Sequence, residues 1–141
     1  MLKGISPVIS PELIKILMEM GHGDEICIGD GNFPAASVGK RLVRLDGHGV
    51  TEVLDAILKL FPLDTYVEKP VALMSVVPGD DVDPVIWKEY ERVIRENEGE
   101  KNIEYVERFA FYERARQCYC VVATGESALY ANIILKKGVV K

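Results

Sequence analysis

The chain has 141 residues, of which 48% are hydrophobic and 28% charged, a composition typical of one globular domain and not of a disordered chain. Its 17 basic and 22 acidic residues give a formal charge of −5, which argues against nucleic acid as a partner because phosphate backbones repel acidic proteins. No apolar stretch approaches the ~20 residues of a membrane span, and no signal peptide is recognisable. Three scattered cysteines do not make a disulfide framework. We therefore expect one cytoplasmic domain over residues 1–141, outside membranes.

Helix-like and strand-like segments alternate from the N-terminus. The sequence Ser10-Pro11-Glu12 is typical of a helix start, and apolar residues at helical spacing continue the helix toward Gly21. The next apolar segment, residues 25–29, predicts a buried strand that ends at Asp30. Residues 30–34, Asp-Gly-Asn-Phe-Pro, predict a loop. A second helix is expected over residues 51–61, with Thr51 as its cap.

The second half of the chain continues this alternation. An apolar run at residues 71–77 between two prolines predicts an interior strand. Asp83-Pro84 predicts the start of a third helix that ends near Gly99. Three further strands are expected at residues 103–106, 118–123 and 130–135, with a short helical piece at 109–116. The pattern predicts an α/β fold, a single layered domain with a mostly apolar central sheet and helices on its faces. Ligands bind in such sheets where strands end.

Both histidines of the chain lie in glycine-containing turns. His22 precedes the first predicted strand, and its imidazole can transfer protons near neutral pH. The same position suits a histidine that interacts with the end of the preceding helix, and both interpretations stay open. No predicted strand end brings His48 beside other polar groups, which favours a surface loop for that residue.

Asp30 closes an apolar strand, so its carboxylate needs hydrogen-bond partners or a ligand. Capping the following turn would supply such partners and leaves a role in sugar binding open. Near the C-terminus, Tyr130 and Asn132 are two positions apart, which places both on the same side of the predicted last strand. If that side faces a pocket, a phenol and an amide are offered to hydroxyl groups.

Residues 108–114, Arg-Phe-Ala-Phe-Tyr-Glu-Arg, combine aromatic rings with guanidinium donors. Such a mixture suits carbohydrate recognition, because rings pack on C–H surfaces and planar donors bind hydroxyl groups. Periodicity favours a plainer interpretation, in which the segment is an amphipathic helix turn with Phe109 or Phe111 in the core.

Several familiar sites are absent from the sequence. It has no glycine-rich dinucleotide motif, P-loop, His-Glu-x-x-His zinc motif or serine nucleophile elbow. Cys118 and Cys120 have the spacing of core thiols and not of a redox pair. The remaining candidates are an acid/base histidine, an acid and hydrogen-bonding groups, which together predict proton transfer on a polar small molecule.

Several motifs, in one order along the chain, resemble the RbsD/FucU family of sugar mutarotases, and within it the L-fucose mutarotase branch. They lie at residues 1–7, 10–13, 20–25, 30–34, 108–114 and 130–138, so the resemblance extends essentially from end to end. Arg108 supports this branch, because the ribose pyranase branch usually carries histidine there.

The resemblance implies an α/β fold without cofactor or metal, a monosaccharide substrate such as L-fucose, and homo-oligomeric rings. These rings are decameric in bacterial members, with sites near subunit contacts. By the same resemblance His22 is the catalytic residue, and Asp30, Arg108, Tyr130 and Asn132 bind substrate.

The implied reaction opens and recloses the sugar ring to interconvert α and β anomers. We expect His22 to transfer the protons, with Tyr130 as a candidate second relay. D-Ribose pyranase activity and a non-catalytic sugar-binding module are the alternatives. Arg108 argues against the first of these, and the acid/base character of His22 argues against the second.

Overall fold

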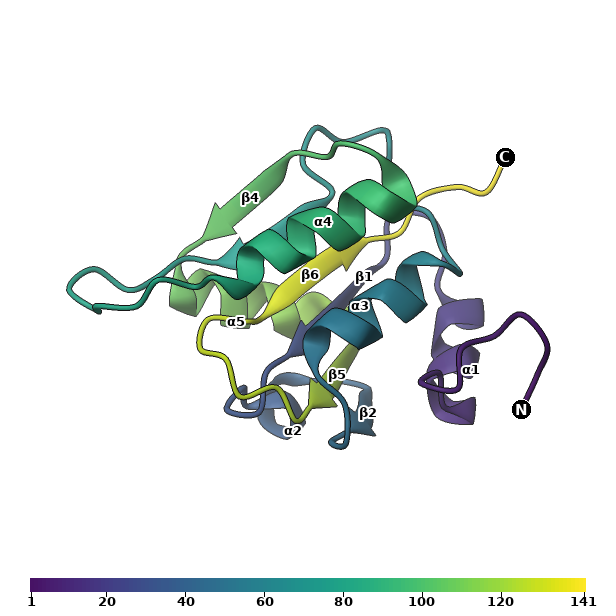
Figure 1. The fold of residues 1–141 in the computed structure, drawn as a ribbon, viewed down its shortest axis with the longest axis horizontal. Coiled ribbons are helices and arrows are strands. Elements are labelled where there is room, and N and C mark those ends of the chain that lie inside the picture. The colour runs from purple at the N-terminus through teal and green to yellow at the C-terminus, as the bar shows by residue number, and fades with distance from the viewer.

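One mixed sheet of six strands, in the order β2-β5-β1-β6-β3-β4, organises the chain. The computed structural model describes residues 1–141 (Figure 1). The strands are β1 (Glu25–Gly29), β2 (Leu42–Leu45), β3 (Val71–Met74), β4 (Ile103–Val106), β5 (Cys120–Thr124) and β6 (Ile133–Lys136). The helices are α1 (Pro11–Glu19), α2 (Ala35–Val38), α3 (Val50–Leu58), α4 (Ile86–Glu98) and α5 (Arg108–Gln117). The predicted α/β layered fold is confirmed. None of the helices has the length and hydropathy that crossing a membrane requires.

Strand direction distinguishes two opposite edges of the sheet. β6 is antiparallel to both of its neighbours, β1 and β3, whereas every other pair is parallel. Five strands therefore end at one edge, where β6 begins, and we call it the carboxyl edge. The opposite edge, where β1 and β3 begin and β6 ends, is the amino edge. Ligands bind α/β sheets preferentially beyond the carboxyl ends of parallel strands.

The helices cover both faces of the sheet, as expected for strands that are apolar on both sides. α1, α3 and α4 pack over the larger core of 27 buried residues, and α2 and α5 over a smaller one of 12. Successive side chains of β1 point to opposite faces of the sheet. Ile26 and Ile28 therefore belong to the larger core and Cys27 to the smaller. In Figure 1, α3 and α4 cross the front of the sheet and α5 lies behind it.

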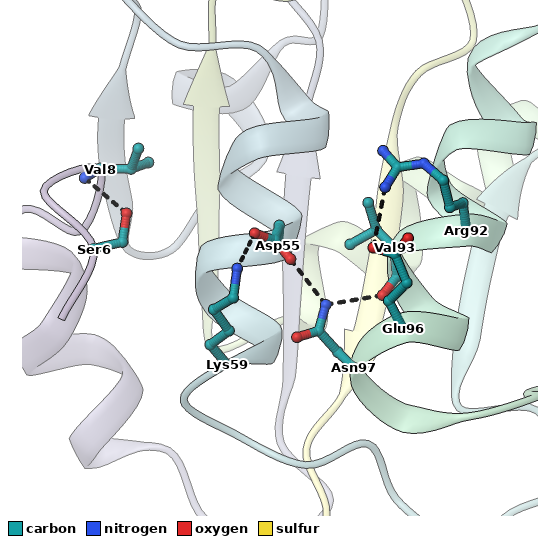
Figure 2. Close-up of polar contacts among 8 residues, drawn as sticks. All are labelled: Ser6, Val8, Asp55, Lys59, Arg92, Val93, Glu96 and Asn97. Carbon is teal, nitrogen blue, oxygen red and sulfur yellow. Dashed lines mark hydrogen bonds and ion pairs between the residues drawn. The ribbon is translucent and has the colours of Figure 1, made fainter. Parts of the chain in front are cut away.

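A polar contact joins α3 to α4 at the surface of the larger core. Figure 2 shows Asn97 of α4 donating from Nδ2 to Asp55 Oδ1 and to the Val93 carbonyl, both at 2.9 Å. Lys59, which directly follows the last residue of α3, pairs with the same Asp55 carboxylate. The hydrogen bonds of Asp55 with Lys59 and Asn97 lower the pKa of this carboxyl.

Several predicted boundaries were wrong. α3 begins at Val50 and Thr51 is not its cap, because the carboxylates of Glu52 and Glu126 accept the Gly49 and Val50 N–H groups. β3 ends at Met74, well before residue 77. β5 begins at Cys120 and not at residue 118. α4 begins at Ile86, two residues after the predicted proline. The short elements α2 and β2 were not predicted.

Candidate functional site

A cavity of about 220 Å³ lies at the carboxyl edge of the sheet. It collects side chains from the ends of β1 and β3, the start of α5 and the segment that precedes β6. The lining residues are Asp30, Asn32, Phe33, Met74, Val77, Asp80, Arg108, Tyr112, Leu129, Tyr130 and Asn132. The structure thus brings together four of the five residues proposed from sequence, namely Asp30, Arg108, Tyr130 and Asn132, and leaves out His22.

Asp30 and Asn132 form the buried base of this cavity, each only 5% exposed. The Asp30 N–H donates to Asn132 Oδ1 at 2.8 Å, and the Ala131 N–H donates to Asp30 Oδ2 at 3.3 Å. Asp30 Oδ1 also accepts the Asn32 N–H at 3.0 Å, so the turn-capping role predicted for Asp30 is confirmed. Burial raises the pKa of Asp30, and the N–H groups of Asn32 and Ala131 oppose that shift.

Tyr130 reaches the cavity through an unusual backbone conformation. Its φ of 55° is the one left-handed value at a residue other than glycine, a conformation that neighbouring contacts must stabilise. Two aromatic donors of α4 supply those contacts: Trp87 Nε1 donates to the Tyr130 carbonyl and the Tyr90 hydroxyl to the Ala131 carbonyl, both at 2.8 Å. Because β6 begins only at Ile133, the predicted strand geometry at residues 130–132 was wrong, although both side chains do face one cavity.

The Tyr130 phenol joins the cavity to the segment after β3. Its hydroxyl donates to Asp80 and accepts the Val77 N–H. The hydrogen bond to Asp80, with burial, raises the pKa of Tyr130. The phenol therefore stays protonated at neutral pH, as a donor and not a base.

Arg108 is the first residue of α5, and its side chain is exposed at the cavity. Its guanidinium carbon lies 4.9 Å from the Phe109 ring centre and 5.8 Å from that of Tyr112. Arg108 forms no ion pair within the chain, whereas Arg114 pairs with Glu25 and Glu104. The N–H donors of Arg108 are therefore available to a ligand.

The three aromatic residues of the segment 108–114 differ in position, and one of them, Tyr112, also lines the cavity. Phe111 is fully buried in the smaller core, and Phe109 is 63% exposed. Phe111 thus enters the core, as the plainer interpretation of this segment predicted, while Arg108 of the same helix lines the cavity.

His22 lies at the amino edge, at the other end of β1. Its Nε2 is 3.1 Å from Asp64 Oδ1, its ring centre is 5.2 Å from that of Tyr66, and its side chain is 46% exposed. Each strand residue adds about 3.3 Å, so β1 alone separates His22 from Asp30 by roughly 15 Å. Within one chain, His22 cannot touch a ligand in the cavity.

The other residues that the sequence singled out lie away from the cavity. His48 is in a surface turn, with Nδ1 2.9 Å from Glu52 Oε1. The cysteines are free and buried, as predicted for core thiols.

Sequence reasoning missed two acids, Asp80 in the cavity and Asp64 beside His22. Asp64 is 4% exposed. Both lie in loops of a chain with 22 acidic residues, so no local signal distinguishes them; only the fold pairs them with Tyr130 and His22.

Residues 3–140 match the RbsD / FucU transport protein family. The L-fucose mutarotase of Actinobacillus pleuropneumoniae serotype 5b is 54% identical over 140 residues, which cover 99% of this chain and 97% of that protein.

Two solved structures share the fold closely. The fucose mutarotase of Streptococcus pneumoniae, crystallised with L-fucose, has a TM-score of 0.95 and 53% identity, covering 99% of this chain and 100% of that one. FucU of Bifidobacterium longum has a TM-score of 0.96 and 59% identity over the same shares.

Proposed function

The chain belongs to the RbsD/FucU family, and we propose from that premise that it is an L-fucose mutarotase, an isomerase that interconverts the α and β anomers of L-fucose. One observation carries the proposal. Asp30, Arg108, Tyr130 and Asn132 converge on a single cavity in a chain that is 53% identical to a fucose mutarotase crystallised with its sugar.

The cavity suits a 6-deoxy pyranose. Arg108 offers N–H donors that no group of the chain uses. Asn132 Oδ1 is occupied by the Asp30 N–H, while its Nδ2 has only a long contact of 3.9 Å to Met74 Sδ, which leaves an amide donor for a hydroxyl. Asp30 is the acceptor at the base. Phe33, Met74 and Leu129 supply apolar surface for C–H groups and the sugar methyl group.

Ring opening needs a proton donor and acceptor at two oxygens. A proton leaves the O1 hydroxyl, the C1–O5 bond breaks as the O1 electrons form the aldehyde, and O5 takes up a proton. Rotation about C1–C2 and reversal of these steps give the other anomer with no net change in protons. One positioned imidazole is typically worth about 10²–10⁴-fold in rate, and orientation of the sugar adds to this.

We assign the proton transfer to His22 of the partner subunit. The cavity contains no histidine, and the His22 imidazole of the same chain lies at the opposite edge of the sheet. A head-to-tail contact between copies brings the amino edge of one copy to the carboxyl edge of the next, and such contacts form a ring when the rotation between successive copies closes. The proposed assembly is therefore a ring-forming homo-oligomer, with the decamer of the bacterial members as its expected size. The free thiols suit the reducing cytoplasm.

The test is exchange NMR on L-fucose, following saturation transfer between the α and β anomeric protons. We expect the protein to raise the exchange rate, His22→Ala and Arg108→Ala to abolish most of the rise, and His48→Ala, the other histidine, to retain it. Pyranose–furanose exchange on D-ribose without any effect on L-fucose would instead assign the chain to ribose pyranase. Sugar binding without exchange would leave a binding module.

A further inference from the structure

The peptide group between Tyr130 and Ala131 is held from both sides by different elements of the fold. Its carbonyl oxygen accepts the indole N–H of Trp87 at 2.8 Å, and its N–H donates to Asp30 Oδ2 at 3.3 Å. Trp87 is the second residue of α4, whereas Asp30 follows β1 at the base of the cavity. The orientation of this peptide therefore connects α4 to the buried acid of the proposed sugar site.

The same peptide follows the one left-handed residue of the cavity. Tyr130 has a φ of 55°, which a bulky side chain adopts only where the surrounding contacts determine it. In this conformation the Tyr130 carbonyl meets α4 while the phenol lines the cavity. Trp87 Nε1 is the only donor of the chain to that carbonyl, so the indole is the group that fixes the plane of the peptide on the side of α4.

The phenol of Tyr130 is bonded to the segment that leads into the same helix. The connection between β3 and α4, residues 75–85, extends beyond the carboxyl edge (Figure 1). It contains a turn closed by the Asp80 N–H, which donates to the Val77 carbonyl at 3.0 Å. The Tyr130 hydroxyl donates to the Asp80 carboxylate and accepts the Val77 N–H at 3.3 Å. One continuous segment, residues 77–87, thus holds Tyr130 at its phenol and at its carbonyl.

We propose that Trp87 is a positioning residue of the sugar site: its indole N–H fixes the peptide that follows Tyr130, and with it the direction of the phenol and of the N–H bound to Asp30. Trp87 is absent from the lining of the cavity, so it acts through Tyr130 and not by contact with the sugar. This inference rests on the proposed function, because it concerns how the cavity holds L-fucose.

A merely structural role is the alternative, because the Trp87 ring also packs. Its centre lies 5.3 Å from that of Tyr105 on β4, and it lies against the larger core. Two variants separate the N–H from the ring. Trp87→Phe keeps an aromatic ring and removes the donor, whereas Tyr105→Leu removes the neighbouring ring and keeps the donor. Tyr105 is 51% exposed and lies outside the cavity, which makes it the matched control.

Kinetics on these variants separate the two roles. Trp87→Phe should raise KM for L-fucose about 3- to 10-fold, the effect of one lost hydrogen bond, with kcat nearly unchanged. Tyr105→Leu should leave KM unchanged. Because Trp87 acts through Tyr130, Trp87→Phe should raise KM by a smaller factor in a chain that already carries Tyr130→Phe. An equal rise in both backgrounds, or an equal rise in Tyr105→Leu, would overturn the proposal.

The unmodified protein provides a test that needs no variant. If the hydrogen bond of Trp87 favours sugar binding, bound sugar must stabilise that hydrogen bond by the same factor. The chain has one tryptophan, so its indole N–H gives a single ¹H–¹⁵N cross-peak. Exchange of this proton with solvent should slow about 3- to 10-fold at saturating L-fucose. An exchange rate that does not change when the sugar binds would contradict the proposal, whether or not Trp87→Phe folds.

A crystal structure of Trp87→Phe decides the geometry without sugar. We expect the peptide after Tyr130 to rotate, so that Tyr130 leaves the left-handed region and the Ala131 N–H leaves Asp30. A Tyr130 that keeps its φ and its hydrogen bonds in this variant would overturn the proposal. If the unmodified protein catalyses no mutarotation, the proposed function fails, whereas this structure still decides whether Trp87 positions Tyr130.

Discussion

Asp30 and Asn132, 102 positions apart in the chain, hold each other in place: the Asp30 N–H donates to the Asn132 amide oxygen at 2.8 Å, and the Asp30 carboxylate accepts the neighbouring Ala131 N–H. The two residues join the end of β1 to the start of β6. The groups that we propose bind the sugar are therefore also part of the folded framework.

Asn132→Ala should affect both stability and binding. The substitution leaves the buried Asp30 N–H without an acceptor, which costs about 1–3 kcal/mol of unfolding free energy, and it should also raise KM for L-fucose. Urea denaturation measures the first effect and exchange NMR at varied sugar concentration the second. Asn102→Ala is the control, because Asn102 is exposed and has no contact with the cavity. Equal unfolding free energies of the two variants would contradict a structural role for the hydrogen bond between Asn132 and Asp30.

Asp30 gives stability a defined pH dependence. Its pKa is raised by burial, so between the ordinary value and the raised one the folded chain binds more protons than the unfolded chain. Stability from this group is therefore greatest at low pH and falls as the pH rises through that window. Asp30→Asn removes the titrating group. The unfolding free energy of this variant minus that of the unmodified chain should therefore rise with pH and then level off. A constant difference between pH 4 and 7 in urea denaturation would contradict this.

The assignment of His22 to a partner subunit predicts complementation. His22→Ala and Arg108→Ala should each be inactive alone. Suppose that each site combines His22 of one copy with Arg108 of another. In random mixed oligomers from co-expression, about a quarter of the sites then contain both residues unmodified. Mixed preparations should therefore regain a corresponding share of the exchange rate. No recovery in oligomers shown to contain both chains would place the two residues of each site in one copy.

The sequence predicted the layered α/β fold because each long element has a local signature, such as the Ser10-Pro11 start of α1 or the apolar run of β1. It also singled out the cavity residue Asp30 because that acid lies directly after an apolar strand. Arg108 was singled out by the resemblance to the RbsD/FucU family, since periodicity alone favoured a plain amphipathic turn for residues 108–114. Tyr130 and Asn132 were predicted for a wrong reason, since the left-handed backbone at Tyr130 depends on Trp87 and Tyr90 of α4. The partners Asp64 and Asp80 were not predictable, because only tertiary packing brings them to His22 and Tyr130.

The cysteines should report unfolding and not redox chemistry. All three are buried and free, and burial raises the pKa of Cys118 to about 12 and of Cys120 to about 11. Since the thiolate is the reactive form, the native protein should resist a disulfide reagent such as DTNB at pH 8. All three thiols should react in concentrated urea. Rapid labelling of a native thiol would show that one strand or helix opens locally.

Tyr130→Phe distinguishes a binding tyrosine from a proton relay. The phenol donates to Asp80 and accepts the Val77 N–H, and its raised pKa keeps it protonated. Loss of the hydroxyl should therefore act mainly on the shape of the cavity. We expect a several-fold increase in KM for L-fucose, a loss of about 1 kcal/mol in unfolding free energy, and kcat within about threefold of the unmodified enzyme. A relay in the proton transfer would instead lower kcat by about 10²-fold or more. Tyr66→Phe is the matched control for stability, because the exposed Tyr66 hydroxyl forms no hydrogen bond within the chain.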